Sequence, residues 1–261
     1  MSATDGEAAA KPQRGAFFVL EGLDRSGKTT QVKLLEQKFI EQGRLVKLMR
    51  FPDRTTPVGQ MIDSYLKSAV RMDDHAIHLL FSANRWEAAY DFPFRARITK
   101  PQDYKLTQAC TCREEIKSLL ESGTNIVCDR YTHSGMVYSA AKGLSGLRLP
   151  WARAPDVGLP RPDRVVFLDL DETTARARGG WGDEVYEKAA MQRQVRRLFG
   201  ALANGGRDGN GELVEGLTGE EGWLSEEGDL RMVSAEGTVE EVAKRVWEEV
   251  DGVRGRGRVL Q

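Results

Sequence analysis

Short apolar segments alternate along the chain with amphipathic segments of helical length. The apolar segments predict strands because they are rich in β-branched and aromatic residues, and they span 16–20, 45–49, 125–128, 164–170 and 230–233. The amphipathic segments predict helices over 31–42, 59–68, 73–87, 134–142, 185–203 and 239–250. This alternation favours an α/β fold in three layers, with a five-stranded parallel sheet flanked by helices. In such sheets, ligands bind at the carboxyl ends of the strands.

The ends of two predicted helices carry recognisable caps. Gly43 follows the first helix and is expected to close it, while Thr238 precedes the last helix and is expected to cap its N-terminus. The segments between and beyond the elements are assigned as a disordered leader over 1–14, an unpatterned insertion over about 92–112, a glycine- and acid-rich loop over 205–227, and a tail over 251–261. One domain over 15–250 is therefore predicted.

Residues 22–30 read G-L-D-R-S-G-K-T-T and satisfy the phosphate-loop pattern G-x-x-x-x-G-K-[ST] between the first strand and the first helix. The glycines let backbone N–H groups curl around phosphate oxygens, and the helix offers its positive end to the same anion. Lys28 could reach the outer phosphates, and the Thr29 hydroxyl could bind Mg²⁺. Asp24 needs a compensating partner beside a polyphosphate, and Arg25 could act as an arginine finger within the same chain. The loop predicts a nucleoside triphosphate site.

Arginines and aromatic residues follow the other strands. The second strand runs into R-F-P-D-R (50–54), the third into D-R-Y (129–131), and the helix between them contains F-S-A-N-R-W (81–86). Arginine forks bind phosphate through two N–H donors, and aromatic faces suit a stacked base. Each arginine taken alone could equally be a solvated surface charge. R-G-G-W-G (178–182) predicts either a lid over the donor, bringing Arg178, or a plain mobile loop.

Composition limits the remaining classes of function. The net charge of −1 argues against a general nucleic-acid surface, and no apolar run approaches the roughly 20 residues of a membrane span. The three cysteines are an odd number for a disulfide framework, and Cys110-Thr111-Cys112 lacks a second ligand pair for zinc. We therefore expect no nucleic-acid or membrane partner and a location in a reducing compartment, the cytoplasm or the nucleus.

Several stretches together resemble the eukaryotic thymidylate kinases, a family of nucleoside monophosphate kinases with the P-loop NTPase fold and a small lid. The matching stretches are V-L-E-G-L-D-R-S-G-K-T-T-Q (19–31), R-F-P-D-R (50–54), L-L-F-S-A-N-R-W-E (79–87), V-C-D-R-Y (127–131), P-D-V-G-L-P-R-P-D (155–163) and R-G-G-W-G-D-E-V-Y-E (178–187). The resemblance covers about 14–199 apart from the insertion, with a weaker match over 232–250. It implies phosphoryl transfer from ATP to dTMP, giving dTDP and ADP in dTTP biosynthesis, with Mg²⁺ and a homodimer.

The resemblance also implies residue roles. Asp24 would meet the 3′-hydroxyl of the acceptor, Arg25 would bridge the phosphates, Phe81 would stack on thymine, and Arg85 would bind its carbonyl. The implied catalytic residues are Asp24, Arg25, Lys28 and Arg130. The implied ATP site comprises Arg25, Ser26, Gly27, Lys28, Thr29, Thr30 and Arg178, with Thr29 as a ligand of Mg²⁺. The implied dTMP site comprises Asp24, Phe51, Arg54, Phe81, Arg85, Arg130, Tyr138, Tyr186 and Gln192, of which Arg54 and Arg130 would hold the monophosphate.

The chain departs from the family in three places. Val185 replaces a charged lid residue, and Glu236-Gly237 replaces a lysine close to the adenine, so the adenine contacts there stay unassigned. The insertion is either a species-specific surface loop or a translated retained intron, which transcript sequencing would distinguish. Two other activities remain as alternatives: another nucleoside monophosphate or deoxynucleoside kinase, and a GTPase switch. The switch would require an N-K-x-D motif, which the sequence lacks.

Overall fold

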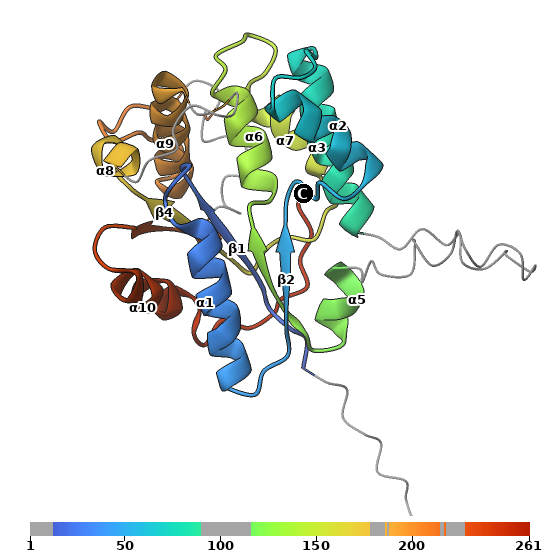
Figure 1. Ribbon diagram of the computed structural model, residues 1–261, viewed down its shortest axis with the longest axis vertical. Coiled ribbons are helices and arrows are strands. Elements are labelled where there is room, and N and C mark those ends of the chain that lie inside the picture. Colours follow the sequence, from blue (N-terminus) through green and yellow to red (C-terminus); the bar gives the residue numbers. More distant parts are fainter. Residues whose placement is uncertain (1–12, 90–115, 178–185, 187, 215–216, 218–227) are drawn as a thin grey trace, which may run out of the picture.

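In the described part of the chain, five parallel strands form one sheet, as predicted (Figure 1). The computed structural model describes residues 13–89, 116–177, 186, 188–214, 217 and 228–261. The strands are β1 (Phe17–Gly22), β2 (Val46–Arg50), β3 (Asn125–Asp129), β4 (Arg164–Asp169) and β5 (Leu230–Ser234). They lie in the order β2-β3-β1-β4-β5. Because β1 pairs with both β3 and β4, the phosphate loop that follows it leaves the middle of the sheet.

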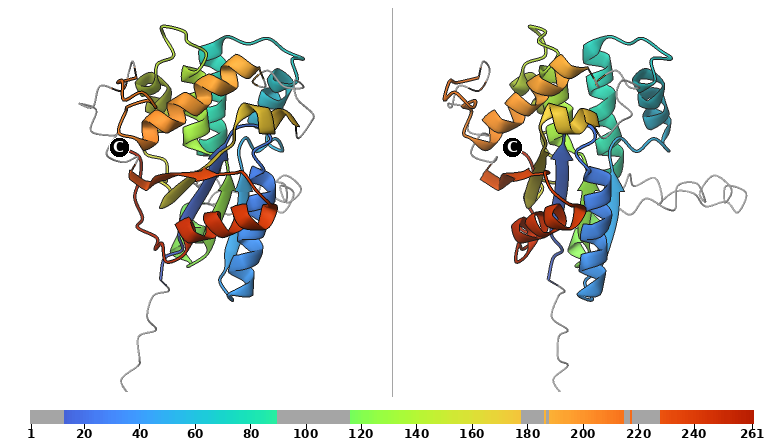
Figure 2. Two further views of the ribbon diagram at one scale, coloured as in Figure 1. Left: turned by 90° about the vertical axis from the view of Figure 1, so that its left-hand side faces the viewer. Right: turned by 60° about the vertical axis from the view of Figure 1, so that its left-hand side comes forward.

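The described helices are α1 (Lys28–Glu41), α2 (Pro57–Leu66), α3 (Asp74–Ala89), α5 (Ile116–Glu121), α6 (Thr132–Ala140), α7 (Leu149–Arg153), α8 (Glu172–Ala177), α9 (Ala189–Ala203) and α10 (Val239–Val250). A 3₁₀ turn over Ala154–Asp156 follows α7. Figures 1 and 2 show α2, α3, α6 and α7 gathered beyond the end of the sheet at which the strands point their carboxyl ends.

Both faces of the sheet are covered, which gives three layers. Phe17 and Val19 pack with apolar side chains of α5, α6 and α9 on one face. Phe18 and Leu20 point to the opposite face and pack with α1 and α10. The alternation of neighbouring side chains along a strand explains why β1 is buried on both sides and reads as a continuous apolar run.

Two helices, α2 and α6, begin earlier than expected because a side chain outside the helix accepts hydrogen bonds from its first N–H groups. α2 begins at Pro57 because the Thr56 hydroxyl accepts a hydrogen bond from the backbone N–H of Gly59 and proline suits the first helical position. α6 begins two residues earlier than expected, and α7 was not predicted at all. The predicted caps are confirmed: Gly43 has φ of 69° after α1, and Thr238 forms a capping box with Glu241 at α10.

Several predicted segments lie outside the described residues. They are residues 1–12 of the predicted leader, the insertion over 92–112, residues 178–185 and 187 of the predicted lid, which include Arg178 and Val185, and residues 215–216 and 218–227 of the predicted loop. Residues 251–261 are described and contact the body of the domain, so the segment assigned as a tail is part of the packed structure. Among the described residues, no helix is long and apolar enough to cross a membrane.

Candidate active site

The phosphate loop joins β1 to α1, and its two glycines are required by geometry. Gly22 has φ of 152°, and a Cβ there would lie 2.7 Å from the Ser26 hydroxyl and 2.8 Å from the backbone oxygen of Leu168. Gly27 has φ of 90° immediately before α1. Both positions therefore exclude side chains, which brings the backbone of the loop close to β4 and leaves the helix N-terminus open.

Lys28 is buried, and its ammonium group lies against the loop itself. Its Nζ donates hydrogen bonds to the backbone oxygens of Gly22, at 3.0 Å, and Leu23, at 2.6 Å. Burial, followed by the nearby positive charge of Arg130, lowers the pKa of Lys28 to about 8. The amine is thus held at the loop, where burial and Arg130 destabilise its charged form.

Asp24 forms an ion pair with Arg130, with 2.5 Å between Oδ1 and the guanidinium. The side chain of Gln192 donates to the other carboxylate oxygen at 2.9 Å and accepts from the backbone N–H of Asp24. Burial acts to raise the pKa of Asp24, but Arg130 and Lys28 outweigh it and lower that pKa. The compensating partner that a carboxylate requires beside a phosphate loop is therefore Arg130.

Glu21 lies under the turn that presents Arg130. Its carboxylate is fully buried and accepts from the backbone N–H groups of Tyr131 and Ser134, both at 3.0 Å, and from the Ser134 hydroxyl at 2.5 Å. These bonds satisfy donors at the start of α6 from a neighbouring strand. Arg130 itself has φ of 67°, a left-handed conformation that costs energy in a residue other than glycine. Glu21 is positioned to hold that conformation.

The end of β3 supplies oxygen atoms beside the loop. The Thr29 hydroxyl donates to Asp129 at 2.9 Å, and the guanidinium of Arg50 lies 3.8 Å from the same carboxylate. Mg²⁺ is usually bound by one or two protein oxygen ligands together with phosphates and water. Thr29 and Asp129 fit that requirement, and the described residues contain no cluster of three or more acidic, histidine or cysteine ligands that would suit another kind of metal site.

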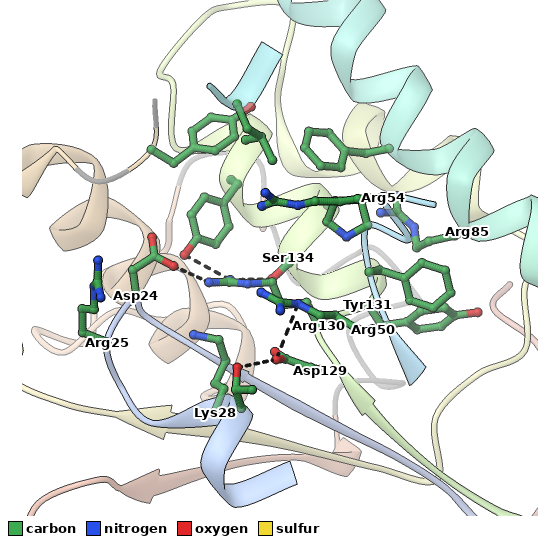
Figure 3. Close-up of a pocket in the computed structure, with 18 of the residues that line it drawn as sticks. Asp24, Arg25, Lys28, Arg50, Arg54, Arg85, Asp129, Arg130, Tyr131 and Ser134 are labelled. Atoms are coloured by element: carbon green, nitrogen blue, oxygen red, sulfur yellow. Dashed lines mark hydrogen bonds and ion pairs between the residues drawn. The ribbon is translucent and has the colours of Figure 1, made fainter. Parts of the chain in front are cut away.

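A cavity of about 510 Å³ extends from the phosphate loop to α2, α3 and α6. Figure 3 shows Asp24, Arg25 and Lys28 on one side of it, Arg54 and Arg85 on the other, and Arg130 between them. The predicted site residues that line the cavity are Asp24, Arg25, Gly27, Lys28, Thr29, Thr30, Phe51, Arg54, Phe81, Arg85, Arg130, Tyr138 and Tyr186. The loop and the arginines thus share one space.

Three predicted residues lie elsewhere. Ser26 and Gln192 are buried next to the cavity without lining it, and Gln192 acts on the cavity through its hydrogen bonds to Asp24. Arg178 is outside the described residues. The sequence reasoning missed Glu21, Asp129 and Asp156 as functional candidates. Glu21 and Asp129 could have been noticed as carboxylates in or next to an apolar strand. For Asp156, the sequence offers only its place in the P-D-V-G-L-P-R-P-D stretch (155–163).

Like Arg130, the two other arginines predicted for the dTMP site are paired with carboxylates. Arg54 forms an ion pair with Asp63 of α2 at 2.7 Å. Arg85 is almost fully buried and makes three hydrogen bonds of 2.7–3.1 Å to Asp156. A Cβ at position 135 would lie 2.6–2.9 Å from the guanidinium of Arg85, so the glycine there leaves room for it. Arg85 is therefore held in one orientation at the wall of the cavity.

Aromatic rings close the far side of the cavity. The rings of Tyr138 and Tyr186 lie 5.5 Å apart, and Tyr65 of α2 packs on Tyr186 at 6.2 Å. Lys142 pairs with Asp74 at the start of α3 and lies 5.3 Å over the ring of Tyr186. The Tyr138 hydroxyl accepts a hydrogen bond from Arg130 at 3.2 Å, yet burial raises its pKa, so this phenol stays protonated.

Arg245 of α10 holds the loop that follows β5, which contains Glu236 and Gly237. Its guanidinium donates to the backbone oxygens of Ser234 and, at 2.7 Å, of Glu236. No local pattern indicates this contact, because Arg245 lies nine positions after Glu236, on the polar side of an amphipathic helix. It keeps the loop after β5 in a fixed shape beside the carboxyl edge of the sheet.

Comparisons with known proteins agree with this geometry. Residues 20–209 match the family model for thymidylate kinase. A thymidylate kinase from Danio rerio is 45% identical over 190 residues, which cover 73% of this chain and 77% of that protein. The enzyme of Homo sapiens is 40% identical, with the same coverage of both chains. A solved structure of thymidylate kinase from Candida albicans superposes with a TM-score of 0.67 at 34% identity, covering 91% of this chain and 92% of that one.

The family model spans well over half of the chain, and its range of 20–209 includes the phosphate loop and the residues that line the cavity. The fold, the loop and the sequence similarity therefore agree, and the chain belongs to the thymidylate kinase family.

Proposed function

We propose that this chain transfers a phosphoryl group from ATP to dTMP, giving dTDP and ADP, inside the cavity of about 510 Å³. The observation that carries the proposal is that the phosphate loop and the ring of arginines and aromatic side chains line the same space. A phosphate donor and a phosphate acceptor bound there would lie next to each other without any large movement of the sheet.

On the donor side, Lys28 and the backbone of the loop bind the outer phosphates of ATP. Lys28 would exchange its present bonds to the Gly22 and Leu23 oxygens for phosphate oxygens. Thr29 and Asp129 would hold Mg²⁺, which would supply positive charge to neutralise the phosphates. Arg25 is exposed, lines the cavity beside Asp24 and Lys28, and would approach the transferred phosphoryl group.

On the acceptor side, Arg130 and Arg54 hold the phosphate of dTMP, Phe81 stacks on the base, and Arg85 donates to a carbonyl of the thymine. Asp24 binds the 3′-hydroxyl of the sugar once phosphate has taken its place on Arg130. A nucleoside monophosphate has a second pKa of about 6 and is mostly ionised at neutral pH. The attacking oxygen therefore needs no general base, and catalysis consists of positioning and charge stabilisation.

An ATP-coupled assay with dTMP, dUMP, UMP, CMP, AMP and GMP tests the assignment. We expect dTMP to have the highest kcat/KM. Preference for a different monophosphate would overturn the substrate and leave the reaction class standing. Arg130→Ala should remove activity with every acceptor. Arg197→Ala removes an ion pair with Asp208 that does not belong to the cavity, and it serves as the matched control.

A homodimer remains a prediction, as does a cytoplasmic or nuclear location. The homodimer is supported by apolar side chains that are 37–48% exposed on and next to α3 and α7, namely Leu79, Trp151 and Val157. Light scattering after size exclusion would measure the assembly, and Leu79→Glu should produce a monomer if this surface forms the interface.

A further inference from the structure

Residues 255–261, here called the strap, run back along the segment that follows α7. The backbone N–H of Gly158 donates to the oxygen of Leu260 at 2.9 Å, and the N–H of Leu260 donates to the oxygen of Leu159 at 3.0 Å. Pro160 and Val259 form an antiparallel bridge. The strap is therefore bound to this segment as a short stretch of added sheet, rather than lying loosely on the surface.

Side chains reinforce the attachment of the strap. Leu260 is 5% exposed and packs in a small apolar cluster with Ala89, Leu159 and Trp86. Arg153, at the end of α7, donates to the backbone oxygen of Gln261. Ala89 and Trp86 belong to the last turn of α3. The strap thus fills the corner between α3 and the segment after α7.

The segment held by the strap carries Pro155 and Asp156, and both are bonded to α3. The Trp86 indole N–H donates to the oxygen of Pro155 at 2.7 Å, and the Ser82 hydroxyl lies 3.1 Å from the same oxygen. Ser82 also donates to Asp156 at 2.7 Å. Trp86 therefore packs against the apolar cluster that contains Leu260, and it also holds Pro155, the neighbour of Asp156, through its indole N–H.

Asp156 in turn fixes the orientation of Arg85. The carboxylate is 1% exposed and accepts from Nε and Nη2 of the guanidinium. The hydrogen bonds to Asp156 use Nε and Nη2 and leave Nη1 out, and Arg85 lines the cavity. A planar guanidinium held through two nitrogen atoms leaves its third in a fixed direction.

We propose that Asp156 is a positioning residue for the acceptor base and that the strap, through Leu260 and Trp86, holds Asp156 in place. The strap thereby sets the affinity for dTMP from outside the cavity. The proposal rests on the function assigned above, because it needs Arg85 to bind the base. It applies to the acceptor alone, since the donor residues Lys28 and Thr29 are positioned by β1 and β3.

Steady-state kinetics of the full-length chain test the proposal, with KM for dTMP and for ATP measured separately. We expect Leu260→Ala to raise KM for dTMP by about 5-fold or more and to leave KM for ATP within about 2-fold. Asp156→Asn, which removes the charge from the pair, should raise KM for dTMP by about 10-fold or more. Val253→Ala is the matched control, because Val253 follows α10 in the same tail but packs against α1 and α10.

Two results would overturn the proposal. One is an equal rise in KM for both substrates with Leu260→Ala, which would indicate general loosening of the fold. The other is a change in melting temperature like that of Val253→Ala with no change in KM for dTMP. In the double variant Asp156→Asn, Leu260→Ala, the second substitution should add little to the increase in KM for dTMP. If the two increases multiply instead, the strap does not act through Asp156. If Asp156→Asn does not fold, Leu260→Ala alone decides. If the wild-type protein prefers another monophosphate, the proposed function is refuted. That result comes from the wild type alone and is therefore distinct from failure of the proposal about the strap.

Discussion

Binding of ATP should be accompanied by proton uptake at Lys28. The empty protein lowers the pKa of this side chain to about 8 by burial and by the charge of Arg130. Phosphate oxygens beside the amine favour its charged form and should return the pKa towards its ordinary 10.5. Lys28 is then about half deprotonated at pH 8 in the empty protein and fully protonated in the complex. The expected uptake is about 0.5 proton per ATP at pH 8, and about 0.1 at pH 7.

Calorimetric titration in buffers of different ionisation enthalpy measures this number directly, as the slope of the observed enthalpy against the buffer enthalpy. The control is Lys28→Arg, because arginine keeps its charge throughout this pH range. No uptake by the wild type at pH 8 would refute the reasoning, and so would uptake of the same size by Lys28→Arg.

The same lowered pKa has a consequence for stability. The shift from 10.5 to about 8 corresponds to about 3 kcal/mol of unfavourable interaction in the charged state of the empty protein. Between pH 8 and 10.5 the unfolded chain holds a proton on Lys28 that the folded protein has released. The contribution of Lys28 to the free energy of unfolding therefore rises with pH through that window. Denaturant unfolding at pH 8 and pH 9.5, compared with Lys28→Arg, isolates this contribution.

Three further predictions concern other parts of the site. Arg25→Ala should mainly lower kcat, because the side chain acts on the transferred group, and unchanged kcat in the coupled assay would contradict that role. Gly135→Ala should raise KM for dTMP by about 10-fold, since the new Cβ would lie 2.6 Å from the guanidinium of Arg85. Gly200→Ala, which meets nothing within 4 Å, is its control and should leave KM unchanged. Glu21→Gln should cost about 1–3 kcal/mol through its three hydrogen bonds, seen by calorimetry as a melting temperature lower by several degrees, and an unchanged value would contradict it.

The sheet could be predicted because its strands are short apolar runs separated by amphipathic helices, and neither pattern depends on distant residues. α7 could not be predicted, since L-P-W-A-R is too short for a periodic signal and contains a proline. The starts of α2 and α6 were misplaced for a related reason. α2 is set by a threonine cap that read as part of a turn, and α6 by Glu21, which lies more than 100 residues earlier in the chain.

The candidate site shows the same division between local and distant information. Lys28, Thr29 and the loop glycines follow from a contiguous motif, and the cavity brings them together with the arginines expected at the strand ends. The partners of those arginines could not be predicted. Arg85 pairs with Asp156, 71 positions away, and Arg130 pairs with Asp24, 106 positions away. Such pairs depend on how helices pack on the sheet, which no local pattern in one sequence specifies.

If the acceptor phosphate binds Arg130 as proposed, the ion pair between Asp24 and Arg130 makes that binding an exchange of anions. The carboxylate already neutralises the guanidinium, so the incoming phosphate would replace one negative partner by another and would release Asp24 towards the sugar. The electrostatic energy gained when Arg130 binds the phosphate is therefore smaller than it would be for an arginine without a carboxylate partner. Added salt screens the pair that is broken as well as the pair that is formed. The affinity for the acceptor should therefore depend less steeply on ionic strength than the charge of its phosphate suggests.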